Sequence, residues 1–102
     1  MDLITKSFVT SKGIVEGVQV KWGTFSILLV AGQKAFLACG VFDLDAIESF
    51  GHAAALVESS PDNPIGNLDR FPNRKIKKVN AKAKALGIEE GMDVIKAFEK
   101  IN

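Results

Sequence analysis

Three short glycine-containing breaks divide the first 42 residues into four apolar runs, and this spacing restricts the fold more than any other feature. The breaks are Lys12-Gly13, Gly23-Thr24 and Gly32-Gln33. Glycine adopts the positive φ that tight hairpin turns require. The spacing therefore predicts a β-meander with strands near residues 3–10, 14–22, 25–31 and 34–42. The last two runs are apolar on both faces, so we expect them at the centre of the sheet, covered by helices on at least one side.

Residues 14–22 alternate with the two-residue period of a β-strand. One face carries apolar side chains and the other carries small or polar ones: Ile14, Val18, Val20 and Trp22 on the first, and Gly17, Gln19 and Lys21 on the second. Only Glu16 interrupts the apolar face. The pattern predicts a strand with one solvent-exposed face, which is the face that carries Gln19 and Lys21.

After Phe42 the sequence changes to a helix start. Asp43 or Asp45 can accept hydrogen bonds from the free amides of a first helical turn, and Gly51 offers a left-handed stop. The small apolar residues 53–57 predict a buried strand reached by a short helical crossover, and residues 59–67 predict a loop.

The last third of the chain predicts two helices. Ile76, Val79, Ala83 and Leu86 recur at helical spacing, which predicts a helix over residues 74–86 that ends at Gly87, with Ile88 folding back on Ala83. A final helix should begin near Gly91 and bury Met92, Ile95, Phe98 and Ile101. We expect one α+β domain over residues 1–102, with a mixed, mostly antiparallel sheet and about three helices packed largely on one face.

Two fingerprints in this sequence resemble the YunC-like family of small bacterial and archaeal proteins. The first runs from Phe36 through Cys39-Gly40 to Asp45 and continues into residues 53–57, and the second is the late turn Leu86-Gly87-Ile88-Glu89-Glu90-Gly91-Met92. The resemblance covers about two thirds of the chain, and residues 61–78 depart from it most. That family has no assigned biochemical activity, so the resemblance implies an architecture and no particular reaction.

Composition narrows the function classes. A net charge of +1 argues against binding polyanions through bulk charge. One cysteine excludes an internal disulfide, and one cysteine with one histidine cannot supply a tetrahedral zinc site. The first residues do not resemble the basic and apolar stretches of a signal peptide, and no apolar run approaches the roughly 20 residues needed to span a bilayer. We therefore expect a cytosolic protein without a cofactor or metal, and its small-molecule ligand, if it has one, is not identified by the sequence.

Cys39 is the candidate nucleophile, because it stands near a strand end just before a helix. His52 is the only imidazole, so a Cys-His mechanism must use it, and Asp43 could orient it. However, a reactive thiolate needs positive potential, and the adjacent helix start carries Asp43 and Asp45. Cys39 as a buried packing residue and His52 as a residue stabilised by a helix C-terminus are the alternatives.

Seven basic residues and no acidic residue occupy the segment 70–88. The candidates for binding nucleic acid are Arg70, Phe71, Arg74, Lys75, Lys77 and Lys78, with Phe71 available for base stacking. An ordinary solvated helix face explains the same pattern.

Residues 43–62 are acidic, so the acidic and basic segments could meet in a homo-oligomer, with affinity supplied by exposed apolar area around Trp22, Phe25 or Phe71. We favour a binding or assembly module that associates with itself. An enzyme using Cys39 and His52 in one cleft, or weak nucleic-acid binding through residues 70–84, are the alternatives.

Overall fold

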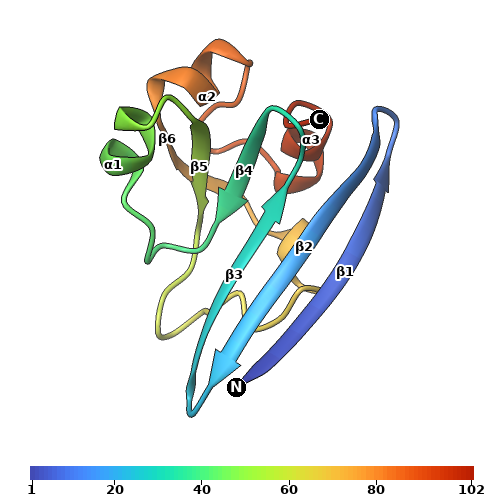
Figure 1. The fold of residues 1–102 in the computed structure, drawn as a ribbon, viewed down its shortest axis with the longest axis vertical. Coiled ribbons are helices and arrows are strands. Elements are labelled where there is room, and N and C mark those ends of the chain that lie inside the picture. The colour runs from blue at the N-terminus through green and yellow to red at the C-terminus, as the bar shows by residue number, and fades with distance from the viewer.

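The computed structural model describes residues 1–102, which form one six-stranded sheet with three α-helices and a 3-10 turn (Figure 1). The strands lie in the order of the chain, and every neighbouring pair is antiparallel except β4 and β5. The elements are β1 Asp2–Thr10, β2 Gly13–Trp22, β3 Phe25–Ala31, β4 Ala35–Ala38, α1 Leu44–Ser49, β5 Ala53–Val57, η1 Phe71–Asn73, β6 Ile76–Val79, α2 Ala81–Ala85 and α3 Val94–Phe98. The predicted α+β class with a mixed, mostly antiparallel sheet is confirmed.

The predicted meander is confirmed at all three breaks, although glycine serves different purposes in them. Gly13 and Gly23 turn the chain with φ of +113° and +55°. Gly32 instead makes room for the C-terminal segment, because a Cβ there would lie 2.4 Å from the backbone oxygen of Ile101. That same oxygen accepts hydrogen bonds from the amides of Lys34 and Ala35. The fourth strand is shorter than predicted and ends at Ala38.

The main core lies on one face of the sheet. It joins strand residues such as Val15, Leu28 and Leu37 to Phe71 of η1 and Phe98 of α3. The rings of these two phenylalanines stack with centroids 6.4 Å apart. Ala83 of α2 also belongs to this cluster, whereas Leu44, the buried residue of α1, does not. Thus α2 and α3 lie with the main core, and α1 covers the opposite face of β4 and β5.

The prediction of which face of β2 is exposed to solvent is wrong. Val15 and Gln19 face the core and are buried, and the Gln19 side chain donates a hydrogen bond to the carbonyl of Gly66. The apolar face, which includes Ile14 and Trp22, is turned to solvent with 54% and 40% of these two residues exposed. The face that the alternation predicted to be buried is therefore uncovered in the single chain.

The predicted helix over residues 74–86 is also wrong in its first half. Residues 76–79 form β6, which pairs with β5, and the chain enters α2 only after Asn80. The other edge of this strand is hydrogen-bonded too, since Ile76 donates to the carbonyl of Met92 and accepts from the amide of Gly91. Two rows of backbone hydrogen bonds outweigh a weak helical pattern in a segment that contains β-branched residues.

The turn between α2 and α3 agrees with the prediction more closely. Gly87 has φ of +91°, and Ile88 donates a hydrogen bond to the carbonyl of Ala83, as predicted. The final helix is shorter at both ends than the predicted range from about Gly91 to Ile101, because it begins at Val94 and ends at Phe98. Ile95 is 59% exposed, which contradicts its predicted burial.

Candidate functional site

The structure does not bring Cys39 and His52 together. The parallel register pairs Ala35 with Ala53 and Ala38 with Leu56, so His52 precedes one end of the β4–β5 pair and Cys39 follows the other. His52 and Cys39 are therefore five residue steps apart along the strands, which at about 3.3 Å per residue is roughly 16 Å. His52 stacks on Phe36, with ring centroids 5.5 Å apart. A mechanism that needs both side chains in one cleft is therefore not supported.

Asp43 has a structural role that the sequence partly indicated. Its carboxylate accepts hydrogen bonds from the amides of Asp45 and Ala46, at 3.0 and 3.2 Å, and so caps the N-terminus of α1. Neither the thiol of Cys39 nor the imidazole of His52 contacts it through a hydrogen bond. The three residues proposed for catalysis thus occupy three separate places.

Cys39 lines an open cleft of about 660 Å³ at the end of the sheet where β4 and β5 finish. Only 7% of this cysteine is exposed. The cleft lies between the start of β3, the segment after β4 and the loop after β5. It is lined by Thr24, Phe25, Ser26, Leu28, Cys39, Gly40, Val41, Ser59, Ser60, Pro61, Pro64, Ile65, Gly66 and Lys77. Sheets with parallel strands often bind ligands beyond the carboxyl ends of those strands.

Arg74 holds the loop that forms one wall of this cleft. Its guanidinium donates two hydrogen bonds to the carbonyl of Glu58, at 3.0 and 3.3 Å. It donates two more to Asn63, at 3.0 Å to the side-chain oxygen and 2.7 Å to the backbone oxygen. The residue is only 8% exposed, so the oxygens of Glu58 and Asn63 replace water as hydrogen-bond acceptors for a buried cation.

Two of the six residues predicted to bind nucleic acid are not available for that contact. Phe71 is completely buried and cannot stack on a base, and Arg74 is committed to the loop. Arg70, Lys75, Lys77 and Lys78 remain exposed. Of these, Lys78 lines a hollow that also contains the acidic residues Asp43 and Asp45.

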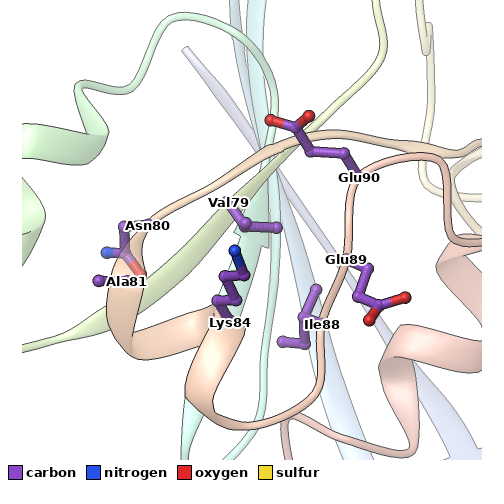
Figure 2. A pocket seen from close by; sticks show the side chains of 7 residues that line it. All are labelled: Val79, Asn80, Ala81, Lys84, Ile88, Glu89 and Glu90. Carbon is purple, nitrogen blue, oxygen red and sulfur yellow. The ribbon is translucent and has the colours of Figure 1, made fainter.

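A second hollow, of about 430 Å³, lies beside the N-terminus of α2 (Figure 2). Its charged lining residues come from two segments: Lys84 belongs to α2, and Glu89 and Glu90 belong to the turn after α2. Asn80 also lines this hollow, and it is buried and makes three side-chain hydrogen bonds. Its oxygen accepts from the amides of Ala54 and Ala83, and its nitrogen donates to the carbonyl of His52. Asn80 therefore joins β5 to α2, and its side-chain oxygen has no free lone pair for a ligand.

The outer face of β1, β2 and β3 carries exposed apolar residues, among them Leu3, Ile14 and Trp22. Register places its residues in rows across the strands, with Leu3, Val20 and Ile27 in one row. Figure 1 shows η1 and its loop passing behind β2 and β3, with no helix on the nearer side of these strands. The sequence predicted that the β2 part of this face, including Val20, is turned away from solvent, although it also named Trp22 and Phe25 as exposed apolar residues. Alternation reports only which residues share a face.

No group of three or more histidine, cysteine, aspartate or glutamate side chains is arranged to hold a metal ion. None of the helices has both the length and the apolar character required to cross a membrane.

The fold and the cleft define a small α+β domain built on a six-stranded meander sheet with a single parallel pair. Residues 38–101, more than half of the chain, match the family described as a domain of unknown function, DUF1805. The chain belongs to this family. The matched segment includes the cleft residues from Cys39 onward, whereas β1 to β3 precede it.

A solved structure supports the same architecture over the whole chain. It is a protein of unknown function, TA1206, from Thermoplasma acidophilum, with a TM-score of 0.84 and 18% sequence identity. The comparison covers 99% of this chain and 94% of that protein. At this identity the similarity establishes the fold alone. No curated protein matches the sequence.

Proposed function

We propose that the protein is an assembly module whose copies associate through the outer face of β1, β2 and β3. One observation carries the proposal: the strand face that the sequence makes apolar is the face that the single chain leaves uncovered. Leu3 is 68% exposed, Ile14 is 54% exposed and Trp22 is 40% exposed. Contiguous apolar surface of this kind on a soluble domain marks an interaction site.

The polar groups on this face favour a second copy of the chain as its partner. The one carboxylate on the face, that of Glu16, accepts a 2.8 Å hydrogen bond from the hydroxyl of Ser7 on the neighbouring strand. This bond leaves the negative charge of Glu16 in place, but Glu16 is the only charged side chain on the face, so the surface around it is apolar or uncharged. A two-fold axis can bring two identical apolar faces together without any further complementarity.

The area is sufficient for a weak to moderate dimer. Three strands spaced by about 4.8 Å and up to about 30 Å long give a projected footprint of roughly 400–500 Å² per copy. The accessible surface is larger than this projection, because the side chains stand out from the sheet. Two copies would then bury about 1,000 Å² or more, which is the lower limit for a specific interface.

Charge complementarity between the acidic and basic segments contributes less to this proposal than the sequence suggested. The two segments already meet inside one chain, where Lys78 shares a hollow with Asp43 and Asp45. In addition, the carboxylate of Glu48 accepts a hydrogen bond from the amide of Lys82. Association driven by the apolar face should therefore persist or strengthen as salt is added, whereas association of charged patches would weaken.

Sedimentation over a range of protein concentrations and ionic strengths tests the proposal. The wild-type protein should sediment as a dimer or larger, and Ile14→Lys should shift it to a monomer with an unchanged circular dichroism spectrum. Ile95→Lys is the matched control, because Ile95 is equally exposed but lies on α3. A wild-type protein that stays monomeric at all concentrations, or an Ile95→Lys variant that dissociates as Ile14→Lys does, would contradict the proposal.

We also propose that the protein works in the cytosol and shares a YunC-like architecture. Its single cysteine is free and buried, as expected in a reducing compartment. Fractionation of cells carrying a tagged copy tests the compartment, and recovery in a membrane or secreted fraction would contradict it.

A further inference from the structure

We propose that the Cys39 cleft is a binding site for a small organic anion, with an apolar body held by the walls of the cleft and a carboxylate or phosphate held by Lys77. This site lies at the end of the sheet and goes beyond the assembly role proposed above. Its volume of about 660 Å³ falls in the range of small-molecule sites.

Lys77 is directed by an irregularity in the sheet. Leu56 pairs with Lys78 and Val57 pairs with Ile76, so Lys77 is an extra residue with no partner on β5. Bulges of this kind change the direction of a side chain and are common beside functional sites. Lys77 consequently lines both the cleft and the polar hollow next to it, and it is the only charged residue of the cleft lining.

Two hydroxyl groups can assist the ammonium group. The Ser59 oxygen accepts a hydrogen bond from the amide of Ile65, and the Ser60 oxygen accepts one from the amide of Asn63. These bonds fix the position of each oxygen and leave its hydrogen available, because a hydroxyl is both donor and acceptor. Both hydrogens can therefore be donated to a ligand oxygen beside Lys77.

The remaining walls fit an apolar body. Leu28, Val41, Pro64 and Ile65 line the cleft, together with the thiol of Cys39. The loop that carries the prolines is held by the four hydrogen bonds of Arg74, so the cleft is formed before a ligand arrives. No carboxylate lines the cleft, and Glu58 lines only the hollow beside it. The charge balance thus favours an anion over a cation.

Titration with four matched probes, followed by amide chemical shifts, tests the site. Phenylphosphate and phenylacetate are the anions, and benzyl alcohol and benzylamine are the neutral and cationic controls. We expect the anions to shift the amides of Gly40 and Gly66, which line the cleft, in a saturable way at millimolar concentration. The neutral and cationic probes should bind at least about tenfold more weakly, as expected when a charge-assisted hydrogen bond is lost.

Variants that remove one charge each separate the effect of charge from that of folding. Lys77→Gln should weaken anion binding at least about tenfold, whereas Lys78→Gln, the neighbouring variant that lines a different hollow, should leave it unchanged. Glu58→Gln should tighten it, because a nearby like charge is removed. The rate at which a thiol reagent labels Cys39 gives a second readout and should fall when the anion is bound.

Several results would overturn the site. The first two are equal binding of the anionic and neutral probes, and equal effects of Lys77→Gln and Lys78→Gln on anion binding. The other two are amide shifts confined to β1 and β2, and no shift of the Gly40 and Gly66 amides together with an unchanged rate of Cys39 labelling. Oligomeric state is read separately by sedimentation. Failure of this site can therefore be distinguished from failure of the assembly proposal.

Discussion

Replacing Arg74 with lysine should strongly destabilise the protein although the positive charge is kept. The guanidinium makes four hydrogen bonds to Glu58 and Asn63 from a position that is 8% exposed. A lysine ammonium is a single point that can reach one or two of these acceptors, and it is more strongly hydrated than a guanidinium. The variant must therefore bury a cation with fewer partners.

The magnitude follows from the number of bonds that are lost. A hydrogen bond from a charged donor contributes about 1.5–3 kcal/mol, and bonds that share acceptors are not additive. Loss of two or three of the four should lower the free energy of unfolding by about 2–4 kcal/mol. For a domain of this size, 1 kcal/mol corresponds to roughly 4–8 °C in the melting temperature. We expect a decrease of roughly 8–32 °C.

Urea unfolding with linear extrapolation measures the difference, and hydrogen exchange of residues 59–67 reports whether the loop opens. Lys75→Gln is the matched control, because Lys75 is exposed and adjacent, and its free energy of unfolding should stay within about 0.5 kcal/mol of wild type. If Arg74→Lys also stays within that limit, Arg74 does not hold the loop. An Arg74 that served phosphate contacts would tolerate lysine in this way.

Three further predictions concern other parts of the fold. Gly32→Ala should cost about 1–3 kcal/mol in urea unfolding, because its Cβ would meet a backbone oxygen at 2.4 Å, whereas Gly40→Ala meets nothing within 4 Å and should be nearly neutral. Asn80→Ala should cost about 2–4 kcal/mol by removing a helix cap and leaving a buried amide unpaired, and equal stability of the two proteins would refute this. Hydrogen bonds from Ser11 lower the pKa of Glu99, so this carboxylate stabilises the fold above its unfolded pKa, and the contribution is lost as pH falls through the lower folded value. Glu99→Gln should flatten the decline in stability between neutral pH and about pH 3, and an unchanged decline would contradict it.

Local signals predicted the turns and caps of this protein well. Gly13 and Gly23 form the hairpins, Gly87 ends α2 with positive φ, and Asp43 caps α1. Each of these features depends on the conformations and hydrogen bonds of a few consecutive residues. The residue types in a short window are sufficient for such predictions.

The candidate site was predicted only in part. The sequence identified Cys39 and Lys77 as residues of interest, but it paired Cys39 with His52 and placed Lys77 on a helix. The parallel register of β4 and β5 separates the first pair, and the bulge in β6 brings Lys77 to the Cys39 cleft. Both features arise from contacts between segments far apart in the chain, which no spacing within one segment can report.

The sequence by itself determined the meander, the α+β class and the two faces of β2. Only the tertiary structure decided which of these faces meets the core, and whether residues 76–79 would be helix or strand. Alternation shows which side chains share a face, but the packing of η1 and α3 selects the face that is buried. Hydrogen bonds to β5 and to residues 91–92 similarly decide the state of residues 76–79, since a short segment follows its neighbours when its own preference is weak.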